Sequence, residues 1–169
     1  APATYNPTQA PVHVMSNLQL GAIVEEDNAN VRNATTSPTA GGTLDSEDGI
    51  AGGIPPISTA YSGGSYSQTV ALSGLTKAGR VCGYIDWNKN GVFASPGERA
   101  CASPAIGATS ATLTWTVPAG LTPGATWARF RVGYTAAQVE APTGRADSGE
   151  VEDYPVTLVL PPLNLAKTA

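Results

Sequence analysis

Leu113-Thr114-Trp115-Thr116-Val117 is the stretch that decides the fold class of this chain, because apolar and hydroxyl side chains alternate along it without a break. Successive side chains of an extended strand point to opposite faces of a sheet. We therefore expect Leu113, Trp115 and Val117 to point into a core while the two threonines face water. The stretch predicts a half-buried β-strand.

The same period of two recurs along the chain. Residues 66–72 alternate in this way, residues 127–134 place Arg129 and Arg131 on the face opposite Phe130, and residues 154–160 direct Tyr154 and Leu160 inward. The 19 glycines and 14 prolines leave little room for long helices, and only residues 136–140 are predicted to form a helical turn. The predicted strands are Val12–Met15, Leu18–Val24, Tyr66–Leu72, Val81–Trp87, Leu113–Val117, Trp127–Tyr134 and Tyr154–Leu160. The fold class is therefore predicted to be all-β: an antiparallel β-sandwich, jelly-roll-like, with long ordered loops.

The chain of 169 residues suits one domain. Residues 1–17 are predicted to be an N-terminal extension or a first edge strand, residues 18–160 the sandwich, and residues 161–169 a linker or the start of a further module. The last boundary lies at Pro161-Pro162, since proline cannot continue a strand ladder. The long loop from Glu25 to Gly64 is expected to be functional or held by something other than a ladder.

The net charge of the chain limits the classes of binding partner that can be expected. The net charge is -4, with 13 acids against 9 bases, which argues against a nucleic acid or an anionic membrane. No run of 18 apolar residues exists that would span a membrane. The acids are clustered, and clustered carboxylates need a cation, either arginine or a metal.

The loop Asp86-Trp87-Asn88-Lys89-Asn90-Gly91-Val92-Phe93 carries the strongest metal pattern. Its D-x-N-x-N-G spacing puts side-chain oxygens at positions 1, 3 and 5, glycine at position 6 and a carbonyl at position 7. Glu98 falls at position 13 rather than the 12 of an EF-hand, and no helix flanks the loop. Calcium favours six to eight such oxygens. The alternative is a tight hairpin turn at Asn90-Gly91, capped by Asn88.

Two further acidic groups are candidate metal sites. The first lies in the long loop, where a solvated loop tip is the alternative. The second precedes the last strand, where Arg129, Arg131 and Arg145 could pair with the carboxylates instead of a metal or together with one. The full set of predicted metal ligands is Asp45, Glu47, Asp48, Asp86, Asn88, Asn90, Val92, Glu98, Glu150, Glu152 and Asp153.

The two cysteines, Cys82 and Cys101, are spaced for a disulfide loop in an oxidising compartment. Two reduced, buried thiols are the alternative. His13 is the only histidine, so no serine–histidine–aspartate set can be assembled and no enzymatic activity is expected. Trp87, Trp127 and Tyr84 are candidate ligand-binding aromatics, which would either stack on a sugar ring or pack beneath a neighbouring loop.

Gly149-Glu150-Val151-Glu152-Asp153-Tyr154 resembles the signature of the GEVED domain, a module of secreted and surface bacterial proteins. Other segments agree in order: Leu20-Gly21, the acidic stretch 45–50, the segment Gly83–Phe93 and Ala128-Arg129-Phe130-Arg131. The resemblance extends over about residues 18–160. It implies a β-sandwich module of adhesins at the bacterial cell surface, with an immunoglobulin-like repeat expected to follow it.

These observations lead to one expectation and two alternatives for function. We expect a calcium-stabilised extracellular module of a bacterial surface protein, acting in adhesion or ligand binding. Its expected partners are a surface protein or glycan of a host or neighbouring cell and the adjacent domains of the same chain. The alternatives are a carbohydrate-recognition module and an inert structural spacer.

Overall fold

The computed structural model describes residues 1–6, 8–22 and 48–162. Ten strands and three short helices are assigned within these residues. The strands are β1 (Pro11–His13), β2 (Gln19–Leu20), β3 (Ile57–Ser58), β4 (Ser65–Ser73), β5 (Arg80–Ile85), β6 (Arg99–Ala102), β7 (Ser110–Thr116), β8 (Gly124–Gly133), β9 (Gly144–Ala146) and β10 (Glu150–Val159). The helices are η1 (Ala3–Tyr5), η2 (Thr59–Tyr61) and α1 (Ala136–Val139).

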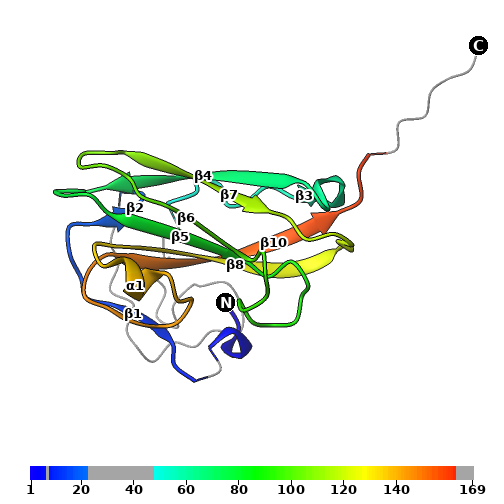
Figure 1. Ribbon diagram of the computed structural model, residues 1–169, viewed down its shortest axis with the longest axis horizontal. Coiled ribbons are helices and arrows are strands. Elements are labelled where there is room, and N and C mark those ends of the chain that lie inside the picture. The colour runs from blue at the N-terminus through cyan, green and yellow to red at the C-terminus, as the bar shows by residue number, and fades with distance from the viewer. Residues whose placement is uncertain (7, 23–47, 163–169) are drawn as a thin grey trace, which may run out of the picture.

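Two sheets face each other and confirm the predicted all-β sandwich (Figure 1). One sheet has the order β2-β4-β7 and the other β3-β10-β8-β5-β6. All the long ladders are antiparallel, whereas the short pairs β1–β9 and β3–β10 are parallel. The two short parallel pairs depart from the predicted antiparallel pattern.

The core lies between the two sheets and follows the predicted alternation. Leu113, Trp115 and Val117 are buried, and they meet Phe130 and Tyr154 of the other sheet in one apolar cluster. The sheets approach closely at a glycine of β5. A Cβ at Gly83 would lie 2.6 Å from Trp115 and 2.8 Å from Phe130, so only a residue without a side chain fits at this position.

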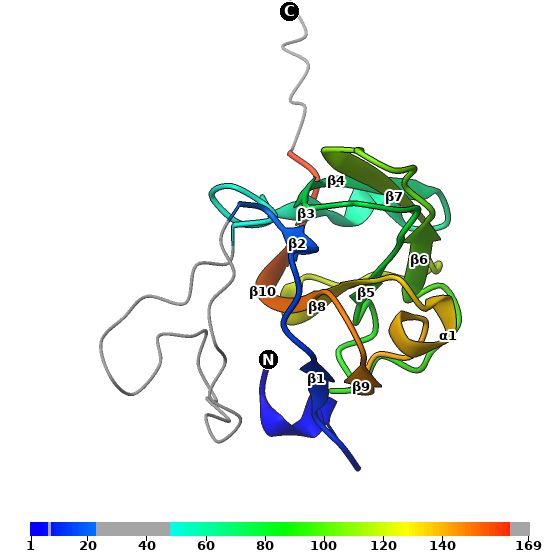
Figure 2. The same cartoon turned by 90° about the vertical axis from the view of Figure 1, so that its left-hand side faces the viewer.

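A third layer covers the outer face of the five-stranded sheet. It is formed by η1, β1, β9 and α1; Figure 2 shows β1 and β9 side by side beneath β8 and β5, with α1 next to β9. A second apolar cluster fills the space beneath it, with Tyr5, Phe93 and Val139 among its members. This layer buries Arg129 and Arg131, which are 1% and 0% exposed although they point away from the main core.

Other predictions are confirmed or corrected at the level of single elements. The helical turn is present as α1, and Cys82 forms the predicted disulfide with Cys101, its direct partner in the β5–β6 register. Leu160 was predicted to point inward but is 68% exposed, because β10 ends at Val159. The described part of the long loop contains β3 and η2. None of the described helices has the length and apolarity needed to span a membrane.

Candidate functional site

The loop between β5 and β6 winds around the Asp86 carboxylate. Asp86 is 0% exposed. Its Oδ1 accepts a hydrogen bond from the amide of Asn90 (3.2 Å) and its Oδ2 accepts one from the amide of Gly91 (2.9 Å). Loop amides four and five residues ahead therefore converge on the first carboxylate of the D-x-N-x-N-G pattern, because the chain turns sharply within it.

The two asparagines extend this arrangement. Asn88 Oδ1 accepts from the amide of Asn90 at 3.0 Å, and Asn90 Oδ1 accepts from the amide of Val92 at 3.0 Å. Within residues 86–93, positive φ occurs at Lys89 (60°) and Gly91 (83°) and not at Asn90. The predicted tight hairpin turn at Asn90-Gly91 is therefore wrong, since that turn requires positive φ at both residues.

Glu98 closes the loop directly before β6. It is 1% exposed. Its Oε2 accepts a 2.7 Å hydrogen bond from the amide of Ser95, whereas its Oε1 is buried and has no hydrogen-bond partner within residues 1–6, 8–22 and 48–162. Burial raises the pKa of Glu98, and the neighbouring Asp86 carboxylate raises it further against the effect of the Ser95 hydrogen bond.

Ser95 is a residue of the candidate site that the sequence analysis did not single out. Its hydroxyl accepts hydrogen bonds from Asn88 Nδ2 (2.7 Å) and Asn90 Nδ2 (3.4 Å), while its amide donates to Glu98. It thereby joins the two amides to the carboxylate. A serine in a loop rich in small residues offers no signal of this role from its spacing alone.

The oxygen atoms of this loop suit a hard divalent cation. Asp86, Asn88, Asn90 and Glu98 place side-chain oxygens on one short loop. Asp86 Oδ1, Asn90 Oδ1 and Asn88 Oδ1 each accept one amide and keep a second lone pair. Asp86 Oδ2 already accepts two hydrogen bonds, from the Gly91 amide and the Tyr5 hydroxyl. Among the described residues, no ion pair involves Asp86 or Glu98, and Lys89 instead donates to Thr122. No three histidine, cysteine, aspartate or glutamate side chains of the described residues form a metal-binding group, so amide and carbonyl oxygens would have to complete the ligand set.

The N-terminal segment, defined here as residues 1–6 and 8–14, contacts the same loop. The Tyr5 hydroxyl donates a 2.7 Å hydrogen bond to Asp86 Oδ2, and the Tyr5 ring lies 4.6 Å from the Phe93 ring. Burial and the hydrogen bond to Asp86 raise the pKa of Tyr5 above its usual range. Thr4 lies against Gly91, where an added Cβ would be 3.4 Å from the threonine hydroxyl.

Asp153 is paired with arginine, one of the two neutralising partners expected from the sequence, and its assignment as a metal ligand stays a prediction. Arg129 donates to both carboxylate oxygens, at 2.7 Å and 2.8 Å, and the Ala1 ammonium lies 2.6 Å from Oδ2. Burial acts to raise the pKa of Asp153, but Arg129 outweighs it and holds that pKa below its usual range. Asp153 faces away from Glu152 because adjacent residues of a strand point to opposite faces.

Arg131 has a different partner from the one expected. Its Nε donates to His13 Nε2 at 3.0 Å, and its other nitrogens donate to the carbonyls of residues 141, 143 and 144. His13 Nδ1 lies 2.8 Å from the Ser148 carbonyl, so this nitrogen carries the ring proton. The sole histidine thus joins β1 to β8. Arg145 lies 3.5 Å from Asp147 on the surface.

Glu152, Glu150 and Asp48 lie near the start of β10. Glu152 is buried and accepts hydrogen bonds from the amides of Asp48 and Gly49 and from the Tyr154 hydroxyl. Burial raises its pKa to about 7 against the effect of these donors. Glu150 accepts from the amide of Leu20, and Asp48 from the amide of Ala22. The predicted ligands Asp45 and Glu47 lie outside the described residues, so a metal site here stays a prediction.

Two of the three candidate ligand-binding aromatics are buried. Tyr84 and Trp87 are each 1% exposed; Tyr84 donates to the Val139 carbonyl and Trp87 to the Gly97 carbonyl. Both therefore pack beneath neighbouring loops, which was the alternative to stacking on a sugar. Trp127 is half-buried.

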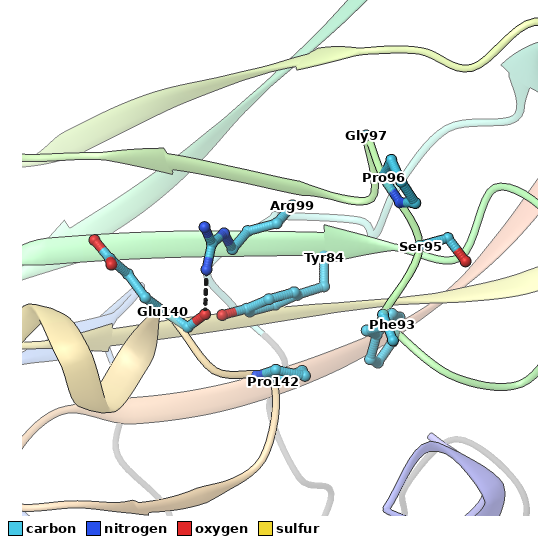
Figure 3. Close-up of a pocket in the computed structure, with 9 residues that line it drawn as sticks. Tyr84, Phe93, Ser95, Pro96, Gly97, Arg99, Glu140 and Pro142 are labelled. Carbon is cyan, nitrogen blue, oxygen red and sulfur yellow. Dashed lines mark hydrogen bonds between the residues drawn. The ribbon is translucent and has the colours of Figure 1, made fainter.

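A shallow cleft of about 370 Å³ adjoins the second half of the β5–β6 loop. Figure 3 shows Arg99, Glu140 and Pro142 around the side chain of Tyr84, with Phe93 and Ser95 at one end. Arg99 donates to the Glu140 carbonyl at 2.6 Å. Because Tyr84 is almost fully buried, the cleft does not offer its ring face to a sugar.

The family model of the GEVED domain matches residues 80–157, which include β5 to β9 and most of β10. This match supports the resemblance seen in the sequence for that part of the chain, which holds the Asp86–Glu98 loop and the Arg129–Asp153 pair. No curated protein and no solved structure matches the chain.

Proposed function

We propose that this chain is an extracellular binding module of a bacterial surface protein whose β5–β6 loop is stabilised by calcium. The observation that carries the proposal is the buried Oε1 of Glu98, which accepts no hydrogen bond from the described residues and lies at the end of a loop with the D-x-N-x-N-G pattern. A buried carboxylate oxygen that accepts no hydrogen bond is costly, and a bound cation would remove that cost.

The ligand set would combine two charged and several neutral oxygens. Asp86 and Glu98 would supply the negative charge, Asn88 and Asn90 their amide oxygens, and Val92 its carbonyl. Such oxygens match the preference of calcium for carboxylates, amides and carbonyls. When bound, the cation would neutralise the two buried acids and hold the loop in one conformation.

The extracellular location is supported by the disulfide. Cys82 and Cys101 are bonded, and disulfides persist mainly in oxidising compartments. Adhesion, with a surface protein or glycan as partner, rests on the family resemblance. Carbohydrate recognition has less support, because Tyr84 and Trp87 are buried. The spacer hypothesis stays a prediction.

Calcium binding is tested by thermal melting of the purified chain in excess chelator and in excess calcium. A cation that binds the folded state raises the melting midpoint in proportion to the logarithm of its concentration. We expect excess calcium to raise the melting midpoint of the wild type and to leave that of the variant Glu98→Gln unchanged. The matched control Asp147→Asn changes an acid that is 62% exposed and should keep the wild-type response.

Terbium luminescence provides a second readout. Trp87 occupies position 2 of the loop, so a lanthanide bound there should be sensitised by indole excitation. An unchanged midpoint in calcium together with no luminescence from terbium would contradict the proposal.

A further inference from the structure

We propose that cation binding in the β5–β6 loop and docking of the N-terminal segment onto the outer face are energetically coupled, so that each strengthens the other. The inference rests on the proposed cation site and adds its regulation. Its basis is that one loop carries both sets of contacts.

The two sets of contacts share Asp86 and otherwise use different positions of the loop. Oxygens at positions 1, 3, 5 and 7, which are Asp86, Asn88, Asn90 and Val92, would face the cation. The N-terminal segment contacts Gly91 and Phe93, at positions 6 and 8, and the Oδ2 atom of Asp86. Both partners can therefore bind at the same time, and Asp86 touches both.

The rest of the segment depends on groups that lie outside this loop. Asn6 Oδ1 accepts from Arg129 at 2.9 Å, His13 accepts from Arg131, and β1 pairs with β9. The amide of Val14 donates to the Ala146 carbonyl at 2.9 Å. A change in loop conformation would therefore directly alter only the contacts between η1 and the loop.

Coupling follows from the state of the loop when no cation is bound. Asp86 and Glu98 are both buried acids, and like charges at close range repel. A loop relieved of that repulsion would hold Asp86, Gly91 and Phe93 in the positions that η1 contacts. By linkage, any factor by which calcium strengthens docking is the factor by which docking strengthens calcium binding.

The test measures both sides of this linkage in the full chain. Hydrogen exchange of the peptide covering residues 1–17 is followed with and without calcium, and calcium affinity is measured by chelator competition. The test variants are Tyr5→Phe, which removes only the hydroxyl, and Tyr5→Ala, which also removes the Tyr5 ring that packs against Phe93. The matched control is Tyr61→Phe, because Tyr61 is 43% exposed and its hydroxyl makes no hydrogen bond with a described residue.

We expect calcium to slow exchange of the N-terminal peptide of the wild type by about fivefold or more, the lower end of typical coupling. Tyr5→Phe should lower calcium affinity, Tyr5→Ala should lower it further, and both should reduce the calcium-dependent protection. Tyr61→Phe should behave as the wild type.

The possible failures are distinguishable. If calcium binds the wild type but both Tyr5 variants keep wild-type affinity and exchange, the coupling is overturned while the cation site stands. If calcium does not bind the wild type at all, the proposed function fails and the coupling fails with it.

Discussion

The Tyr5 hydroxyl lies 2.7 Å from Asp86 Oδ2, although the two residues are 81 positions apart in the sequence. This hydrogen bond joins the first helix of the chain to the loop that carries the strongest metal pattern. Asp86 thus receives three donors, two from its own loop and one from the N-terminal segment. The candidate site is therefore built by two distant parts of the chain.

The Arg129–Asp153 pair should contribute strongly to stability. Arg129 is 1% exposed and donates to both oxygens of Asp153. Arg129→Met leaves that carboxylate without its bidentate partner, so we expect a loss of about 3 kcal/mol or more in the free energy of unfolding, measured by urea denaturation. The control Arg145→Met affects an ion pair whose side chains are 66% and 62% exposed and should cost less than about 1 kcal/mol.

His13 should make the protein less stable in acid. Burial, with Arg131 nearby, lowers its pKa from 6.5 to about 4. The unfolded state therefore binds the proton more readily, so the contribution of His13 is present above pH 6.5 and is lost as the pH falls through about 4. We expect His13→Gln to reduce the fall in melting midpoint between these values.

The contribution of Glu152 to stability changes with pH in the opposite direction to that of His13, so the two contributions must be separated. Its pKa is raised from 4.5 to about 7, so its stabilising effect is present below pH 4.5 and is lost as the pH rises through 7. Glu152 contributes equally to the stability of the wild type and of His13→Gln, so its contribution cancels when the two proteins are compared at each pH. Equal slopes for the two proteins would contradict the role assigned to His13.

Reducing the disulfide should destabilise the fold without changing its topology. Cys82 and Cys101 are 19 positions apart, and the chain-entropy model gives about 3 kcal/mol for a loop of this size. Unfolding of the double variant Cys82→Ala/Cys101→Ala measures this contribution. A midpoint equal to that of the oxidised wild type would show that the disulfide adds no stability.

Gly83→Ala should disturb the closest approach of the two sheets. The added Cβ would lie 2.6 Å from Trp115 and 2.9 Å from Leu113, both in the core. We expect a loss of about 1 to 3 kcal/mol, typical of an overfilled core. At Gly79 the nearest atom would be the Leu75 Cδ2 at 3.3 Å, so Gly79→Ala should cost less in the same denaturation experiment.

Much of the sandwich could be predicted because its signal is local. Strand alternation placed Trp115, Phe130 and Val156 inside, and all three are buried. The same rule put Arg129 and Arg131 on the opposite face, which is correct. It could not show that they are buried, because the layer that covers them comes from distant segments.

The candidate site likewise has features that could be predicted from the sequence and features that could not. The D-x-N-x-N-G spacing and Glu98 could be found in the sequence, because the loop that joins them is short and contiguous. The contacts of Ser95 and the choice of Arg129 as the partner of Asp153 could not, since they depend on which side chains meet after folding. Leu160 fits the alternation but lies beyond the end of β10.

The sequence by itself determined the all-β class, the faces of the long strands and the oxygen-rich loop, because each depends on the period of two or on spacing within a few residues. Only the tertiary structure decided that the N-terminal segment forms a third layer and that Tyr5 and His13 hydrogen-bond to Asp86 and Arg131. Contacts between residues about 80 or more positions apart leave no local pattern, because they arise only when the sheets and loops pack together.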